Sequence, residues 1–336
     1  MTKMQAPRRK LLETAVMLTA LLVLGNGAAM AVGTAAPSAQ KPAAIVANAV
    51  HAPMLAAARA GPRVVAVGEH GVVLLSDDGK TFRQAKSVPT QALLTSICFA
   101  DDKLGWAAGH DGVVIHTADG GDTWALQHED LASDKPLFSI YFKDAQHGFA
   151  VGLFGTAIQT ADGGHSWTPL AVETGEGSDS DSGDHHLYAI FGDPAAALYI
   201  AGEAGLIYRS ADGGSTWSTI KTSNPGSFWT GTRLKDGFLL AAGERGHLFA
   251  SRDQGASWTE IPSGTQESLT SIQQGEDGSI LITGLAGTLL RSRDGGNSFA
   301  ALSRPDRVPL NAALLSTQTG PLLFSGNGIL QAGAAP

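Results

Sequence analysis

The chain has 336 residues and a formal net charge of −8, with a mean hydropathy of +0.03. The negative charge argues against nucleic-acid binding, because neutralising phosphates requires lysine and arginine. The single cysteine, Cys98, excludes an intramolecular disulfide framework. Its position in the apolar run "TSICF" is typical of a small buried hydrophobe rather than a nucleophile.

Residues 1–31 have the pattern of an export signal. Basic residues at 3 and 8–10 precede an apolar stretch over 11–24, and "AMA" at 29–31 fits cleavage between small residues. The stretch is short for a membrane anchor, which needs about 20 apolar residues. We expect a Sec-type signal, with a twin-arginine signal as the alternative because of "RRKLLE", and a periplasmic protein. An Ala/Pro-rich segment over 32–42 is expected to be flexible.

The rest of the chain is built from repeats. Six copies of one short motif occur: "SDDGKTF" (76–82), "TADGGDTW" (117–124), "TADGGHSW" (160–167), "SADGGSTW" (210–217), "SRDQGASW" (251–258) and "SRDGGNSF" (292–299). Each follows a Gly-x-x-Gly, and the first glycines are Gly68, Gly109, Gly152, Gly202, Gly243 and Gly284, with a degenerate seventh at Gly326. A period of 40–50 residues is typical of solenoids or propellers.

Within each repeat, four short apolar runs are separated by Gly/Asp clusters. In the second repeat they are "LLTSICF", "LGWAAG", "GVVIHT" and "TWALQH". Runs of this length, rich in Val, Ile, Phe and Trp, predict strands. Four strands per repeat predict an all-β, seven-bladed propeller over 43–336, with six blades and an irregular cap as the alternative. The last repeat lacks a fourth strand, and we expect "AAIVANAV" (43–50) to supply it and close the ring.

The repeated motif is the Asp box, S/T-x-D-x-G-x-S/T-W/F, and we interpret it as structural. Its aspartates can accept hydrogen bonds from the turn, its glycines allow positive φ, and its aromatic ring can bury beside the turn. These positions are Asp78, Asp119, Asp162, Asp212, Asp253 and Asp294, with Trp124, Trp167, Trp217 and Trp258. A catalytic site occurs once per chain, whereas this motif occurs six times.

Candidate metal and catalytic chemistry is weak. The acidic insert at 174–186 places Asp179, Asp181 and Asp184 with the alternation of a calcium loop, but Ile190 occupies the twelfth position, where that loop needs a glutamate. Asp boxes also occur in sialidases, which leaves a sialidase-like glycoside hydrolase as an alternative. Yet Glu69, Glu203 and Glu244 recur at one place in the blade, and recurrence favours a structural role. We expect no catalytic residue, metal, cofactor or small-molecule substrate.

Candidate binding residues lie on two surfaces. The turns between second and third strands should share one face with the interblade connections, and there Phe154 and Arg245 are candidate partner contacts. The positions flanking the box Ser/Thr carry four arginines in repeats 4–6: Arg209, Arg252, Arg291 and Arg293. Arginine forks suit carboxylate or peptide recognition. Outer-strand charge that only aids solubility is the alternative interpretation.

Two stretches, "ICFADDKLGWAAGHDGVVIHTADGGDTWALQ" (97–127) and "YFKDAQHGFAVGLFGTAIQTADGGHSWTPL" (141–170), resemble the repeats of the photosystem II stability/assembly factor family. The resemblance covers about residues 54–330. It implies an exported seven-bladed propeller without enzymatic activity. Photosynthetic members of that family help to assemble a membrane complex by binding a newly made subunit, partly through arginines on one face. Relatives also occur in non-photosynthetic bacteria, some linked to RND-type exporters.

From the resemblance we expect a protein partner, a membrane-protein subunit or envelope complex, and a role as an assembly or accessory factor. We expect a non-photosynthetic bacterial relative of the family. An accessory subunit of an RND-type envelope transporter is the nearest alternative.

Overall fold

The computed structural model describes residues 41–172, 185–193, 195–315 and 320–331, all within one compact unit. The predicted export signal and most of the 32–42 segment lie outside the described residues, as does the insert over 174–184. None of the helices in the described part of the chain has the length and apolar character needed to span a membrane.

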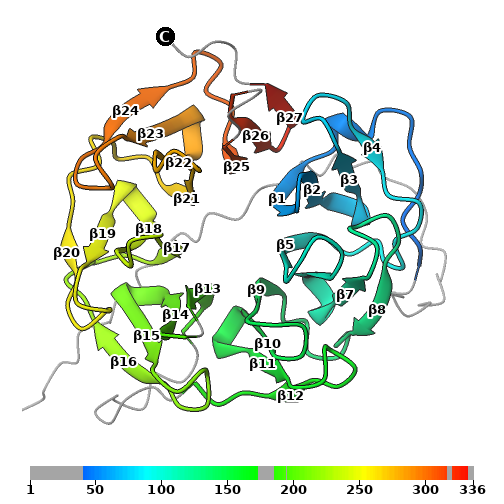
Figure 1. Cartoon of the computed structure of the whole chain (residues 1–336), viewed down its shortest axis with the longest axis horizontal. Helices are drawn as coiled ribbons and strands as arrows, with labels where there is room; N and C mark the ends of the chain where they lie inside the picture. The colour runs from blue at the N-terminus through cyan, green and yellow to red at the C-terminus, as the bar shows by residue number, and fades with distance from the viewer. Residues whose placement is uncertain (1–40, 173–184, 194, 316–319, 332–336) are drawn as a thin grey trace, which may run out of the picture. The chain divides into compact units, whose positions relative to one another are not determined.

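Seven antiparallel sheets stand side by side around a common axis, so the seven-bladed prediction is confirmed (Figure 1). In every sheet the strands follow chain order from the axis outwards. The innermost strands are β1 (Met54–Ala60), β5 (Leu94–Phe99), β9 (Leu137–Phe142), β13 (Leu187–Asp193), β17 (Phe228–Arg233), β21 (Leu269–Gln274) and β25 (Leu310–Leu314). The second strands are β2 (Arg63–Gly68), β6 (Gly105–Gly109), β10 (Gly148–Gly152), β14 (Ala197–Gly202), β18 (Leu239–Gly243), β22 (Ile280–Gly284) and β26 (Leu322–Ser325).

The outer half of each blade is shorter and more polar. The third strands are β3 (Val73–Ser76), β7 (Val114–Thr117), β11 (Ala157–Thr160), β15 (Leu206–Ser210), β19 (Leu248–Ser251), β23 (Thr288–Ser292) and β27 (Gly328–Gln331). The fourth strands are β4 (Arg83–Gln84), β8 (Ala125–His128), β12 (Thr168–Pro169), β16 (Ser218–Lys221), β20 (Thr259–Glu260) and β24 (Ala300–Ser303). The seventh sheet has three strands among the described residues.

The core lies between the blades. Second strands such as β6 ("GWAAG") and β18 ("LLAAG") are buried along their whole length because a neighbouring blade covers each face. Small residues let the sheets approach, and large side chains fill the space between them. Trp106 is 1% exposed and stacks on Phe142 of the next blade, with ring centroids 3.5 Å apart.

Tight turns join the second and third strands in six blades. They are η2 (Glu69–Gly71), η3 (His110–Gly112), η4 (Leu153–Gly155), η5 (Glu203–Gly205), η6 (Glu244–Gly246) and η7 (Leu285–Gly287). Each has a central residue with φ between 51° and 59°, followed by a glycine with positive φ. Two successive residues of this kind are typical of a type I′ hairpin turn. The turns lie beside the interblade connections, as expected: the backbone N–H of His110 donates to the Leu93 carbonyl.

The predicted closing strand over 43–50 is wrong in the described structure. Residues 43–46 run along the outside of the first blade, where the Ala43 N–H donates to the Val88 carbonyl and Gln84 holds residues 44 and 46. The chain then forms the short helix η1 (Ala49–His51), which packs against the seventh blade. The segment was predicted to pair because it is apolar, but Ala49 is its one buried side chain, and Ile45 and Val46 are 67% and 46% exposed.

The ring instead closes by direct packing of the seventh blade on the first. Phe324 and Leu314 share one apolar cluster with Met54 and Leu74. At the axis, the Asn311 side-chain amide donates to the Met54 carbonyl at 2.9 Å. The seam therefore has the construction of the other blade interfaces near the axis and departs from it only at the outer edge.

Candidate functional site

The Asp-box carboxylates are saturated by their own turns. Asp212 Oδ1 accepts hydrogen bonds from the Thr216 backbone N–H (2.9 Å) and the Ser210 hydroxyl (2.7 Å), and Oδ2 accepts from the Thr216 hydroxyl (2.6 Å). The hydroxyl and backbone donors of Thr216 hold the pKa of this carboxyl well below its usual range. In the next box, donation from Ser257 lowers the pKa of Asp253 to about 2. These hydrogen bonds hold each aspartate within its own turn.

Two of the four box tryptophans are buried and bonded to their own turns. Trp217 is 6% exposed and its indole N–H donates to the Gly214 carbonyl at 3.1 Å. Trp124 repeats this arrangement with Gly121. Trp167 and Trp258 pack at the edges of neighbouring clusters.

Each Asp-box turn also covers the outer part of the preceding blade. In four successive interfaces, the backbone carbonyl of the residue after the box aspartate accepts a hydrogen bond from a side chain of the preceding blade. The pairs are Arg63 with Gly120 (3.2 Å), Gln127 with Gly163 (3.0 Å), Lys143 with Gly213 (3.3 Å) and Arg209 with Gln254 (2.9 Å). This contact links the blades beyond their apolar core.

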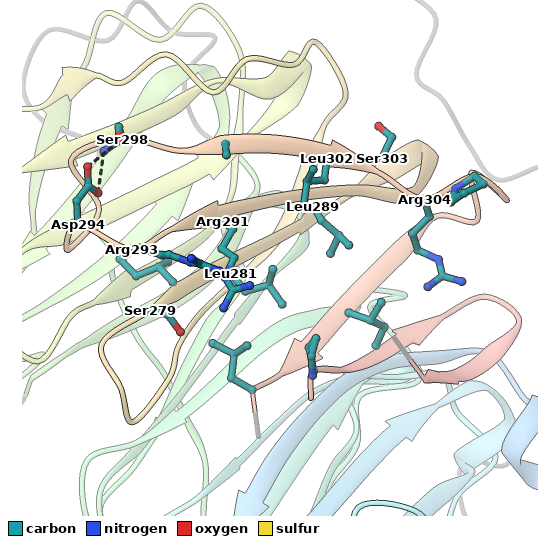
Figure 2. Close-up of a pocket in the computed structure, with 16 residues that line it drawn as sticks. Ser279, Leu281, Leu289, Arg291, Arg293, Asp294, Ser298, Leu302, Ser303 and Arg304 are labelled. Atoms are coloured by element: carbon teal, nitrogen blue, oxygen red, sulfur yellow. Dashed lines mark hydrogen bonds between the residues drawn. The ribbon is translucent and has the colours of Figure 1, made fainter. Parts of the chain in front are cut away.

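The four candidate arginines lie at three successive blade interfaces rather than in one cluster. Arg209, in β15, is committed to the Gln254 carbonyl of the next turn. Arg252 lies over the Phe238 ring, 4.1 Å from its centroid, and donates to the Asn297 side-chain carbonyl of the next turn. Arg291 and Arg293 line a groove between the sixth and seventh blades (Figure 2). Their role in partner binding stays a prediction.

The groove has a volume of about 900 Å³ and extends from the Asp-box turn of the sixth blade to the connection after β24. Leu281, Leu289 and Leu302 line it from the sixth blade, and Leu315 and Leu323 line it from the seventh. Figure 2 shows Leu289 and Arg291 on β23, with Leu302 on the adjacent strand β24. Leu289 packs partly against the apolar cluster between the two blades, whereas β24 is exposed along its whole length.

Phe154 and Arg245 occupy the central position of their hairpin turns, with φ of 51° and 52°. Phe154 is 48% exposed, and its ring stands edge-on to His186 with centroids 5.0 Å apart. The Phe154 backbone N–H donates to His186 Nδ1 at 3.2 Å. Arg245 is exposed, and its backbone N–H donates to the Ser268 hydroxyl at 3.2 Å.

The structure also shows an aromatic cluster beside Phe154 that the sequence analysis did not predict. Tyr188 stacks on Phe138 with centroids 5.7 Å apart and planes 8° apart, and it also meets His186 edge-on at 6.0 Å. Phe138, Tyr188 and Trp229 each follow the first buried residue of an innermost strand, on three successive blades. Aligning "LFSIYF", "LYAIFGD" and "FWTGTR" by blade could have found this shared position. Burial raises the pKa of Tyr188 to about 12, so its hydroxyl keeps its proton.

The recurring glutamates on this face brace the connections between blades. Glu203 Oε2 accepts a hydrogen bond from the His186 backbone N–H at 3.0 Å, and Glu244 Oε2 accepts one from the Ser227 backbone N–H at 3.1 Å. Glu203 also lies 3.9 Å from His185 Nδ1. Each glutamate thus fixes the residue just before an innermost strand of its own blade.

Metal and thiol chemistry find little support in the described residues. Within 41–172, 185–193, 195–315 and 320–331, no three His, Cys, Asp or Glu side chains gather as metal ligands. The candidate calcium ligands of the insert lie outside these ranges. Burial raises the pKa of the Cys98 thiol to about 12, which suppresses the reactive thiolate.

Comparisons with known proteins agree with this architecture. The model of the family described as photosynthesis system II assembly factor YCF48 matches residues 125–282. A search of the curated proteins found no match in sequence. Similar solved structures include "YCF48 bound to D1 peptide" (18% identity, TM-score 0.66, 83% of this chain and 92% of that chain). Others are YCF48 from Cyanidioschyzon merolae (14%, 0.65, 86% and 97%) and virginiamycin B lyase from Staphylococcus aureus (12%, 0.67, 86% and 96%). At these identities the structural likeness concerns the fold.

Proposed function

We propose that this photosystem II assembly factor-like β-propeller is an exported, non-enzymatic protein that binds a subunit of a membrane complex and assists its assembly. The matched family and the propeller fold support a protein-binding assembly factor. One similar structure is described as YCF48 bound to a D1 peptide. The signal-like pattern over residues 1–31 supports export.

The partly buried aromatic cluster around the exposed Phe154 ring carries the proposal. Phe154 holds 48% of its surface in solvent at a turn position where a bulky residue with positive φ is strained. His186, Tyr188 and Phe138 extend the cluster towards the axis. Aromatic clusters of this kind are typical of the energetic centre of a protein interface.

The carboxylates around this cluster support binding over bond-breaking. Glu203 and Glu244 accept backbone hydrogen bonds that hold the interblade connections. A glycosidase would need two carboxyl groups facing one sugar, with one of them available as an acid. The positions of these glutamates in the fold therefore suit a binding rim.

Site-specific photocrosslinking in the native host tests the proposal. Benzoylphenylalanine is placed at position 154 and, as a matched control, at position 286, because Ala286 has the same turn position and a φ of 52° on the sixth blade. We expect position 154 to form an adduct with one membrane-protein subunit, identified by mass spectrometry, and position 286 to form none. Phe154→Ser should weaken binding of that subunit about thirtyfold, which corresponds to the loss of about 2 kcal/mol typical of an interface anchor.

Absence of an adduct at 154, or the same adducts at both positions, contradicts the proposal. An adduct with an RND-type exporter subunit would favour the transporter alternative. Cleavage of fluorogenic sialosides by the purified chain, abolished by changing one carboxylate, would favour the hydrolase alternative.

A further inference from the structure

The outer part of the sixth blade lacks the cover that the preceding blades have. At the interface between the fifth and sixth blades, the Asp-box turn of the sixth blade brings Phe299 into the apolar cluster and seats Gly296 against Phe238. No described residue of the seventh blade plays this part for the sixth. As a result Leu302 is 40% exposed beside Leu289, directly above the groove.

The groove also holds a donor without an acceptor. Arg291 precedes the box serine of the sixth blade, as Arg209 precedes that of the fourth, where it donates to the next turn. Neither Arg291 nor Arg293 makes a hydrogen bond or ion pair with another residue in the described part of the chain. Arg291 stands opposite Leu281 and Ala300 in the sheet, so its guanidinium shares a face with the apolar floor.

The other charged groups at the groove are already engaged. Asp294 is locked by Ser292 and Ser298 in its own turn. Arg304 pairs with Asp306 at 2.6 Å. Asp277 accepts hydrogen bonds from the Ser279 hydroxyl and backbone N–H. These bonds lower the pKa of Asp277, and the charge of Arg291 adds to the effect. Two arginines therefore remain available at this site on a chain of net charge −8.

A second copy of the chain is disfavoured because it carries the same net negative charge and uses its own box aspartates internally. A partner segment fits the chemistry better.

We propose that the groove between the sixth and seventh blades binds a segment of a partner protein in which an apolar side chain stands beside a carboxylate. The apolar side chain covers Leu289 and Leu302, as Phe299 covers the fifth blade. The carboxylate accepts hydrogen bonds from Arg291, as the Gln254 carbonyl does from Arg209. This inference rests on the proposed protein-binding function, from which the class of partner is taken. It assigns a second binding site, separate from the hairpin turns.

Selection from random peptides tests the site without knowledge of the partner. Phage-displayed 12-residue peptides are selected on the purified chain, and enriched peptides are synthesised and measured by fluorescence anisotropy. We expect enriched peptides to carry an aromatic or aliphatic residue within a few positions of Asp or Glu. Their affinity should fall at least tenfold for Leu302→Asp and for Arg291→Gln.

Leu131→Asp is the matched control, because Leu131 is also 40% exposed and the change shifts net charge by the same single unit. This variant should bind the peptides as the unchanged chain does, and all three variants should keep its melting temperature within a few degrees. Enriched peptides without the paired features, or equal affinity for Leu302→Asp and Leu131→Asp, would overturn the inference. The photocrosslink from position 154 is measured separately in the Leu302→Asp variant. Failure of the proposed function and failure of the groove proposal therefore appear in different assays.

Discussion

Truncating Phe324 tests whether blade packing closes the ring. The side chain is fully buried in the cluster that joins the seventh blade to Met54 and Leu74 of the first. Phe→Ala at such a site removes the transfer free energy and leaves a cavity, at a cost of about 3–5 kcal/mol. Native domains are stable by only about 5–15 kcal/mol, so Phe324→Ala should remove a large share of the total. We expect the melting temperature to fall by about 10 °C.

Thermal unfolding followed by circular dichroism measures the effect, with Leu131→Ala as a control at a site that is 40% exposed. Hydrogen exchange locates it: amides of β1 and β26 should exchange faster, while those of β14 in the fourth blade should change less. A loss for Phe324→Ala no larger than that of the control would refute closure by apolar packing at this seam.

Two further predictions concern the Asp-box turns. Asp253 has a folded pKa of about 2 against an ordinary value of 3.8, so its stabilising effect is complete above pH 4 and is lost as pH falls towards 2. In urea titrations, the difference in unfolding free energy between the unchanged chain and Asp253→Asn should therefore close over that window. A difference that stays constant with pH would contradict the assignment. Gly214→Ala should destabilise the chain by about 1–3 kcal/mol more than Gly295→Ala. A Cβ at 214 would lie 2.3 Å from the Phe149 ring, whereas one at 295 meets nothing within 4 Å. Equal losses in thermal melts would contradict close packing of Gly214 on the Phe149 ring.

The repeat pattern predicted the blades and their turns because these depend on local chemistry. The Asp-box spacing specifies a hairpin whose donors and acceptor lie within four residues, as the contacts of Asp212 show. The closing strand was wrong because burial of "AAIVANAV" depends on the shape of the seam. Gly328 lacks a Cβ and lets the chain at Val50 approach closely, so residues 49–51 pack there as the short helix η1.

The candidate site was less predictable because it is assembled across blades. Phe138 and Tyr188 each read as an ordinary strand residue, and their stacking emerges only when blades stand side by side. Arg209 and Arg291 occupy the same motif position, yet one is satisfied by the next turn and the other faces a groove. Motif position therefore could not separate a structural arginine from an available one.

The tight turns at η2 to η7 have a consequence for how this protein can diversify. Their central residues are His70, Asp111, Phe154, Ala204, Arg245 and Ala286, which share one backbone conformation despite unlike side chains. The geometry comes from the turn and its glycine, and none of the six central residues is buried. Six positions on one face can thus change in charge or polarity independently, with strain as the cost of a bulky residue, so new surface recognition can arise by point substitution while the blades stay intact.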